Sequence, residues 1–555
     1  MFWIVRALGV VEIFVTRQQL REFAHKCPFG ILDQGVLHMA DLPRRIRVAG
    51  STVVMARSGD PRCPPHCLTS TSEGERAMPL SGKLVTATLL PAVVVGGLLV
   101  SATSASANVA VTQVSSDPFT DAQAQHRTEV EPDTFAFGNT IVSAFQVGRV
   151  SGGGSSDIGF ATSTDGGATW TSGFLPGTTA NTGGPCGQIS DAAVAFDAKH
   201  NVWLISSLGV NCPSGEPVLT SRSTDGGKTF GNPITTATGS LDKNWIVCDN
   251  TASSPFYGNC YTEYDITSSG DAIRMKTSSD GGLTWGPARA TGDGATGLGG
   301  QPVVRPNGTV LVPYLSLNDQ IRSFRSIDGG AGWRSTVLVS SVSHHDAAGG
   351  LREEALPSAE IDGDGTAYVA WSDCRFRAGC PGNDIVLSKS TSETTWGAPT
   401  RVPIDATTST VDHFVPGIGV DPSTSGAGAR IGLTYYFYPT ANCTAATCQL
   451  DVGFISSANG GTSWSTPTQV AGPMNLSWIP NTSQGRMFGD YISTSVRAGG
   501  NAFPVVPIAS APSGSTFTMG MFAPTGGLPI TGGARRTAEA PVSPAGTAES
   551  ALTAF

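Results

Sequence analysis

The chain has 555 residues, a formal net charge of -9 and only 14% charged residues, and it contains 69 glycines and 36 prolines. This composition is typical of many short strands joined by turns, and it argues against a fold built from long helices. The mild acidic balance gives no support for nucleic-acid binding, so we expect no nucleic-acid partner.

The one long apolar run, residues 84–100, predicts a secretory signal peptide. It follows Lys83 and ends at the small residues Ala105, Ser106 and Ala107, which suit cleavage after Ala107. The alternative is a membrane anchor, but prolines and glycines interrupt the run and no basic cluster follows it. We therefore expect a secreted, extracellular protein with no stable membrane span in the mature chain.

A signal peptide belongs at the start of a chain, so Met78 is the expected start. The sequence then divides into an upstream extension outside the fold (1–77), a signal peptide (78–107), a folded region (108–526) and a disordered tail rich in small residues (527–555).

The cysteines after Met78 fall into close pairs, which predicts disulfides in an exported chain. A zinc site at the last pair is not expected, because no further cysteine or histidine lies at ligand spacing. The expected pairs are Cys186 with Cys212, Cys248 with Cys260, Cys374 with Cys380, and Cys443 with Cys448.

A turn motif recurs along the chain. In four copies a serine precedes Asp-Gly-Gly by two residues and an aromatic residue follows the aspartate by five; a fifth copy has asparagine, and a sixth, at 390–396, lacks the glycines. The carboxylate can accept backbone N–H bonds across the turn, the glycines permit positive φ, and the aromatic residue packs beneath. The polar residues of the five turns are Asp165, Asp225, Asp280, Asp328 and Asn459.

This pattern resembles the Asp-box, or BNR repeat, of the sialidase superfamily. The resemblance implies an all-β chain folded as a β-propeller of four-stranded antiparallel blades. It also implies that the repeated turns lie on the face opposite the ligand site, so their aspartates are expected to be structural.

Alternating apolar segments precede each turn, as strands of a blade require. First strands start near Glu131, Asp191, Lys243, Gln301, Pro357, His413 and Asp490, which favours seven blades, with six as the alternative. The last unit lacks a fourth strand, and residues 109–114 could supply it and close the ring.

Charged residues in the loops of the predicted ligand face are the candidates for function. In chain order they are Arg127, Glu129, Glu131, Arg149, Asp157, Asp191, Asp242, Lys243, Glu263, Asp265, Arg352, Glu353, Glu354, Asp373, Arg375, Arg377, Asp412, His413, Arg486, Asp490 and Tyr491. For each one taken singly, a structural salt bridge is the alternative reading.

A sialidase needs arginines for the substrate carboxylate, a tyrosine nucleophile with a carboxylate partner, and an acidic proton donor. The candidates for catalysis are Asp373 as the acid, Glu353 or Glu354 as the partner, and Tyr491, or Tyr435, as the nucleophile. The candidates for substrate binding are Arg149, Arg352, Arg375, Arg377, Arg486 and Asp490.

The Arg-Ile-Pro tripeptide that the sialidase family carries in its first strand is missing, and Glu131-Pro132 opens the first unit instead. The leading hypothesis is a secreted sialidase-like glycoside hydrolase whose partner is an extracellular carbohydrate or glycoconjugate. The alternatives are a non-catalytic glycan- or protein-binding propeller and a different glycosidase or lyase. The sequence contains no cofactor motif, so no cofactor and no metal site are predicted.

Overall fold

The computed structural model describes residues 3–7, 11–15, 45–48, 51–54 and 109–532, and it divides into two compact units, Met1–Val100 and Ser101–Phe555. In the first unit β1 (Trp3–Ala7) pairs with β2 (Val11–Val15), and β3 (Arg45–Val48) pairs with β4 (Ser51–Val54). These hairpins lie in the stretch for which the sequence predicts no fold, and β-branched and aromatic residues favour their pairing. The rest of that stretch and the predicted signal peptide, 78–107, lie outside the described residues.

In the second unit the strands pair into seven antiparallel sheets, which we call blades 1 to 7. Blades 1 and 2 are joined in one larger sheet by a single pair, Ser155 with Ile189. The strands of blade 1 are β6 (Ala124–Phe137), β7 (Thr140–Val150), β8 (Ser155–Ser163) and β9 (Thr171–Phe174), and those of blade 2 are β10 (Gln188–Asp197), β11 (Val202–Val210), β13 (Val218–Ser223) and β14 (Ile234–Ala237).

The middle blades include two less regular sheets. In blade 4 two short strands pair with the same neighbour, β20, and together form the inner edge. Blade 3 has β15 (Gly239–Cys248), β16 (Cys260–Ile266) and β17 (Ala272–Ser278), with β12 (Gly215–Glu216) parallel to β15; blade 4 has β18 (Gly297–Leu298), β19 (Val303–Val304), β20 (Val310–Ser316), β21 (Gln320–Ser326) and β22 (Val337–Ser341).

Blades 5 to 7 complete the series, and blade 7 combines both ends of the folded region. The strands are β23 (Ser358–Ile361), β24 (Ala367–Asp373), β25 (Asp384–Ser390) and β26 (Thr400–Arg401) in blade 5; β27 (Asp412–Val420), β28 (Ile431–Tyr438), β29 (Gln449–Ser457) and β30 (Thr468–Asn475) in blade 6; and β33 (Ser493–Val496), β34 (Ala502–Ser513), β35 (Thr516–Pro524) and β5 (Val111–Gln113) in blade 7.

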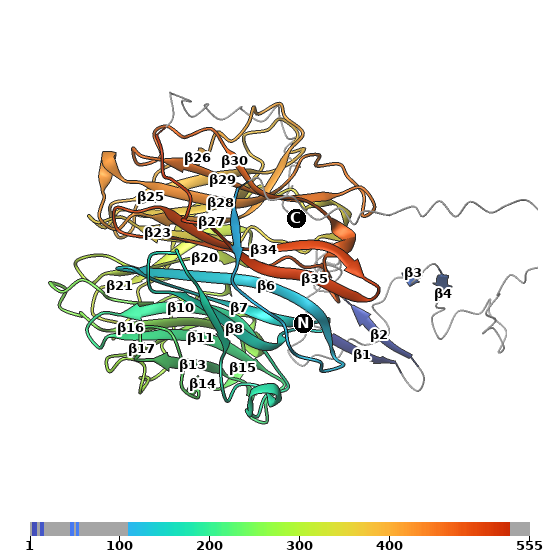
Figure 1. Ribbon diagram of the computed structural model, residues 1–555, viewed down its shortest axis with the longest axis horizontal. Helices are drawn as coiled ribbons and strands as arrows, with labels where there is room; N and C mark the ends of the chain where they lie inside the picture. The colour runs from blue at the N-terminus through green and yellow to red at the C-terminus, as the bar shows by residue number, and fades with distance from the viewer. Residues whose placement is uncertain (1–2, 8–10, 16–44, 49–50, 55–108, 533–555) are drawn as a thin grey trace, which may run out of the picture. The chain divides into compact units, whose positions relative to one another are not determined.

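The innermost strands form a closed ring, so the all-β fold is a β-propeller. Each innermost strand contacts the next one along the chain, and β33 of blade 7 returns to contact β6 of blade 1. Figure 1 shows β6 running beside β34 and β35, which brings the start and the end of the folded region together. The predicted closure is confirmed, because Gln113 of β5 pairs with Phe522 of β35.

The remaining elements are short. They are the β31 (Asn481–Thr482) and β32 (Gly485–Arg486) hairpin and the 3-10 helices η2 (Ala180–Thr182), η3 (Thr267–Ser269), η4 (Ala348–Gly350), η5 (Gly426–Gly428) and η6 (Leu476–Trp478). None of the helices in the described part of the chain has the length and apolar character that a membrane crossing requires.

The prediction that the disordered tail starts at residue 527 is wrong, because residues 527–532 belong to the folded region. Leu528 is buried and exchanges both backbone hydrogen bonds with Ala502, and the Thr531 N–H donates to Ser456 Oγ at 3.0 Å. Small polar residues suggest disorder by composition, but the apolar side chains of Leu528 and Ile530 are buried here. Residues 533–555 lie outside the described residues.

The repeated turns have the internal bonding that their sequence predicts. Ser223 Oγ donates to Asp225 Oδ1 at 2.7 Å, and the same carboxylate oxygen accepts the Thr229 N–H at 3.0 Å. Gly226 and Gly227 have φ of 84° and 81°, which only glycine adopts freely. The equivalent serine bonds to Asp165, Asp280, Asp328 and Asn459 give these residues the same local structural role.

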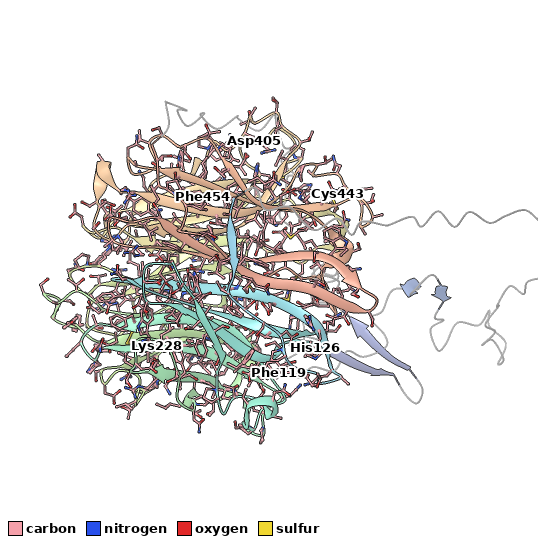
Figure 2. All side chains as sticks on the ribbon, in the orientation of Figure 1. Phe119, His126, Lys228, Asp405, Cys443 and Phe454 are labelled. Carbon is pink, nitrogen blue, oxygen red and sulfur yellow. A yellow bond between two sulfur atoms is a disulfide. The ribbon has the colours of Figure 1, made fainter. Side chains whose placement is uncertain are left out.

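All four predicted disulfides are confirmed. They join Cys186 to Cys212, Cys248 to Cys260, Cys374 to Cys380, and Cys443 to Cys448. The Cys443 disulfide (Figure 2) closes a loop between β28 and β29, so these sulfurs do not form a metal site.

Replacing Asp225 by alanine tests the structural role of the turns. The Asp225→Ala variant loses the acceptor for the Ser223, Lys228 and Thr229 donors, so we expect its melting temperature to fall by about 3 °C or more. The matched control is Asp364→Ala, which removes an exposed turn carboxylate that accepts no side-chain or backbone bond within the described chain. Equal melting temperatures for the two variants would contradict the role assigned to the turn aspartates.

Candidate functional site

Four innermost strands carry a β-bulge. The pairing register shifts between Val130 and Asp133 in β6, Ser190 and Ala193 in β10, Asp242 and Trp245 in β15, and Phe414 and Gly417 in β27. Each bulge holds one non-glycine residue at positive φ, and the four are Glu131 (56°), Asp191 (49°), Lys243 (40°) and Val415 (48°). Such residues are uncommon and cost free energy, and their concentration at one site is a pointer to function.

Three of the bulge residues converge on one another. Lys243 Nζ lies 2.9 Å from Asp191 Oδ1 and 3.8 Å from Glu131 Oε1, although the three residues come from three different blades. The Asp490 N–H donates to Glu131 Oε1 at 3.1 Å, and Arg352 donates to the Asp490 carboxylate. We call Glu131, Asp191, Lys243, Arg352 and Asp490 the central cluster.

The side chains of the central cluster differ in their exposure to solvent. Glu131 is 1% exposed, whereas the side chains of Asp490 and Arg352 are 13% and 26% exposed. Within this group, Arg352 and Asp490 are therefore more accessible to solvent than Glu131.

Arg149 adds a second guanidinium group beside Arg352. Its side chain is buried and donates to the Gly154 carbonyl, and its Nε lies 2.9 Å from Met487 Sδ. Burial and then the positive charge of Arg352 lower the pKa of Arg149. Two neighbouring guanidinium groups, one of them partly exposed, can bind a carboxylate with directed hydrogen bonds.

The carboxyl groups of the cluster are in different electrostatic states. Burial raises the pKa of Glu131 to about 7 in spite of the nearby charge of Lys243. Burial acts in the same direction on Asp490, but the charges of Arg352 and Lys243 outweigh it and hold the pKa of Asp490 below its usual range. A protonated carboxyl beside an ionised one is the arrangement that acid–base catalysis uses.

Tyr491 lies next to the cluster, and its side chain is held in place by its neighbours. Lys243 Nζ sits 4.1 Å from the centre of its ring, and the ring of Trp245 packs edge-on at 5.1 Å. The Tyr491 hydroxyl donates to the Ala192 carbonyl at 3.1 Å, and burial raises the pKa of this hydroxyl well above its usual range. The geometry therefore makes Tyr491 a support for Lys243 and not an activated nucleophile.

The structure does not bring Asp373 and Arg375 into the central cluster. Arg375 Nε and Nη2 donate to the two oxygens of Asp373 at 2.9 and 2.6 Å, and the Trp371 indole N–H donates to the same carboxylate at 3.0 Å. Asp373 is fully buried. The predicted acid and one predicted substrate-binding arginine thus satisfy each other at the end of β24.

Arg377 is likewise taken up by a separate buried network in blades 5 and 6, in which Asp405 is labelled in Figure 2. Arg377 and Arg401 both donate to Asp384 Oδ1, at 2.6 and 2.9 Å, and both contact Asp405. Asp384, Asp405 and His413 have the residue types of a metal site, but the two guanidinium groups already bond the carboxylates. This cluster is an ion-pair network.

The other predicted residues lie around the cluster without entering it. Glu353 accepts a hydrogen bond from the Ala347 N–H and lies 2.8 Å from His344 Nε2, while Glu354 is exposed and its charge raises the pKa of Arg352. Arg486 donates to the Ile479 carbonyl, and its own carbonyl accepts the Arg352 N–H at 2.7 Å. Glu353 and Arg486 thus hold the segment that presents Arg352.

Sequence reasoning named Glu131, Asp191 and Lys243 as loop residues but gave them no role. What distinguishes these three residues is that each lies in a β-bulge. In the sequence, the one indication of a bulge is Pro132, because proline cannot donate a hydrogen bond to a strand ladder. Tyr435, the alternative nucleophile, is buried and packs against His413 instead of the cluster.

No family model matches this chain, and no curated protein matches it. Solved structures with a similar arrangement include a protein of unknown function from Dyadobacter fermentans (18% identity, 63% of this chain and 99% of that chain, TM-score 0.40). They also include a Hadza microbial sialidase (14%, 72% and 66%, 0.38) and a leech intramolecular trans-sialidase (13%, 71% and 67%, 0.35). At these identities and TM-scores the likeness does not extend to a substrate or a reaction.

Because several carboxyl groups are buried, we predict that the free energy of unfolding falls as pH rises. Burial raises the pKa of Glu129 and Glu360 to about 8 and that of Glu131 and Asp133 to about 7. Because these folded-state values exceed the unfolded ones, the folded protein binds protons more tightly, and that stabilisation is lost as pH rises from about 5 to about 9. We expect the free energy of unfolding, measured with denaturant, to fall by about 2 kcal/mol or more over this interval.

The Glu129→Gln variant tests the origin of this pH dependence, since glutamine imitates the protonated carboxyl. Its stability should fall less steeply with pH than that of the wild type. Glu393→Gln, at a half-exposed position, is the control and should keep the wild-type slope. A wild-type protein that is as stable at pH 9 as at pH 5 would refute the prediction.

Proposed function

We propose that the protein is a secreted glycoside hydrolase that acts on extracellular glycans, with sialosides, and hence exo-α-sialidase activity, as the leading assignment. The observation that carries the proposal is the pair of unlike carboxyl groups at the centre of the ring. Glu131 is a buried acid with a pKa of about 7, and it accepts a hydrogen bond from the backbone of Asp490, an ionised carboxylate bound by Arg352. Glycosidases use such a pair.

In this proposal each group has one task. Arg352, with Arg149 behind it, binds the carboxylate of an acidic sugar. Glu131 donates its proton to the glycosidic oxygen as the bond to the anomeric carbon breaks. A water molecule then bonds to the anomeric carbon through its oxygen and returns a proton to Glu131. Asp490 supplies the negative charge that stabilises the developing oxocarbenium ion. Lys243, whose Nζ lies 3.8 Å from Glu131 Oε1, partly offsets the effect of burial on the pKa of Glu131.

These roles differ from those expected from the sequence. Tyr491 would have to leave the Ala192 carbonyl before it could attack a sugar, and Asp373 is saturated by Arg375. Glu131 therefore replaces Asp373 as the proposed acid, and Arg352 and Arg149 remain from the proposed set of substrate-binding arginines.

The Arg352→Lys variant tests the role of the guanidinium group. Lysine keeps the positive charge but loses the planar pair of donors, so we expect kcat/KM for a fluorogenic sialoside to fall about 100-fold. Arg334→Lys, at an exposed position, should leave kcat/KM unchanged. A folded wild-type protein that releases no fluorophore would refute the sialoside assignment, and equal activity of the two variants would refute the role of Arg352.

The Glu131→Gln variant tests the proton donor. Glutamine cannot exchange a proton, so kcat should fall at least about 100-fold, and the decline of the wild-type rate above pH 7 should disappear from the residual activity. The control is Glu129→Gln, two residues earlier in β6 and outside the central cluster, which should keep the wild-type pH profile. A Glu131→Gln enzyme with an unchanged profile would exclude Glu131 as the acid.

A non-catalytic glycan-binding propeller is the second candidate. The observation that favours it is the ion pairing within the central cluster. Lys243 neutralises the charge of Asp191, and Arg352 neutralises the charge of Asp490. Isothermal titration that detects sialoside binding to a protein with no hydrolytic activity would select this function.

A further inference from the structure

A buried glutamine side chain contacts the proposed acid. Gln146 of β7 is 0% exposed, and its backbone pairs with that of Val130, next to the bulge that holds Glu131. The side-chain Nε2 of Gln146 donates to Glu131 Oε2, and it also donates to Ser190 Oγ at 3.1 Å. One amide group of blade 1 therefore joins the bulge of β6 to the bulge of β10.

The hydrogen bonds at Glu131 suit an ionised carboxylate. Oε1 accepts the Asp490 N–H at 3.1 Å, Oε2 accepts the Gln146 amide N–H, and the Lys243 ammonium group lies 3.8 Å from Oε1. All three neighbours are donors. A carboxyl group that has taken up a proton carries an O–H donor of its own, and this donor needs an acceptor when it is buried.

Gln146 has an acceptor that is not in use. Its Oε1 is buried and has no hydrogen-bond partner among the described residues. A primary amide is planar, with a donor at one end and an acceptor at the other, so a half-turn about its last side-chain bond exchanges the two ends. After this half-turn Oε1 faces Glu131 and Ser190. Both can then donate to it, the protonated carboxyl through its O–H and the serine through its hydroxyl.

The other groups around Glu131 are less suited to accept its proton. The carboxylates of Asp191 and Asp490 are bound by Lys243 and Arg352, so a bond to Glu131 would compete with an ion pair. Gln146 is neutral, and its unused oxygen costs no ion pair. The titratable and charged groups that interact electrostatically with Glu131 are the other members of the central cluster together with Arg149 of β7, Tyr436 of β28 and Tyr491.

We propose that Gln146 is a positioning residue for Glu131, and that its amide makes a half-turn each time the carboxyl gains or loses its proton. In the ionised form Nε2–H donates to Glu131, and in the protonated form the Glu131 O–H donates to Oε1. No covalent bond of Gln146 forms or breaks, and the proton stays on Glu131 until it moves to the glycosidic oxygen. This inference rests on the proposed function, and it adds the residue that keeps both protonation states of the acid hydrogen-bonded.

The Gln146→Met variant tests this role, because methionine has a similar length but no N–H donor and only a weak acceptor. Glu131 can be followed without substrate, by infrared spectra of the full chain from about pH 5 to about pH 9, where the carboxyl band that is absent from Glu131→Gln belongs to Glu131. A hydrogen bond to an ionised group is stronger than one to a neutral group, so we expect the pH midpoint of this band to rise by about one unit or more.

Gln188→Met is the matched control. Gln188 is a buried glutamine of β10 whose amide donates to Gln123 and not to Glu131, so this variant should keep the wild-type midpoint. Equal midpoints in the wild type and Gln146→Met would overturn the proposal. A wild-type spectrum without a band from Glu131 would overturn it as well, since the carboxyl would then take up no proton in this range.

Activity gives a separate readout. The alkaline decline of kcat/KM for a fluorogenic sialoside should move in Gln146→Met by the same amount as the infrared midpoint. If the wild type hydrolyses no sialoside, the proposed function fails, but the infrared midpoint still decides the role of Gln146.

If Gln146→Met does not fold, NMR of the wild type decides the question. With an NMR-active nitrogen isotope in the glutamine side chains, one NH2 signal should move with the same pH midpoint as the infrared band and should stay fixed in Glu131→Gln. Glutamine NH2 signals that all stay fixed while the carboxyl titrates would overturn the proposal.

Discussion

This structure depends on side-chain bonds at the centre of the ring, because within the described residues the innermost strands of neighbouring blades share no backbone ladder. Strands within a blade form ladders, but the ring around the axis is joined by side chains, as in the bonds of Asp133 to Val194 and Ser358 to Ile418. A buried backbone group without a partner is costly, so each of these side chains must occupy one position. The charged residues of the central cluster are placed by the same ring.

The bulges leave backbone groups without partners, and the contacts between neighbouring blades supply those partners. A bulge leaves backbone groups outside the ladder, and side chains of other blades satisfy them. In β10 the Asp191 carbonyl accepts from Asn244 of blade 3, and the Ala192 carbonyl accepts from the Tyr491 hydroxyl. The Tyr491 hydroxyl thus completes the hydrogen bonding of the bulge that projects Asp191 toward Lys243. This structural role explains the hydrogen bond of the hydroxyl to Ala192 better than a catalytic role does.

The sequence predicted most of the fold because its signals are local. The turn at Asp225 is complete within eight residues, and the Cys374 disulfide spans only six. The site was harder, since a one-residue bulge reverses which side chains face the axis and leaves little trace in composition. Arg375 and Arg377 looked suited to an anion, yet each is satisfied by a nearby aspartate that sequence spacing does not reveal.

The state of Glu131 connects the electrostatics of the cluster with its proposed chemistry. When Glu131 is protonated, the cluster loses one negative charge, and Arg149, Arg352 and Lys243 face a smaller number of carboxylates. Under the proposed function, an acidic sugar would therefore bind most tightly to the protonated form. By linkage, the bound anion would raise the pKa of Glu131 from its value of about 7, since each event favours the other. The substrate that the arginines select would itself keep the acid protonated until the proton is needed.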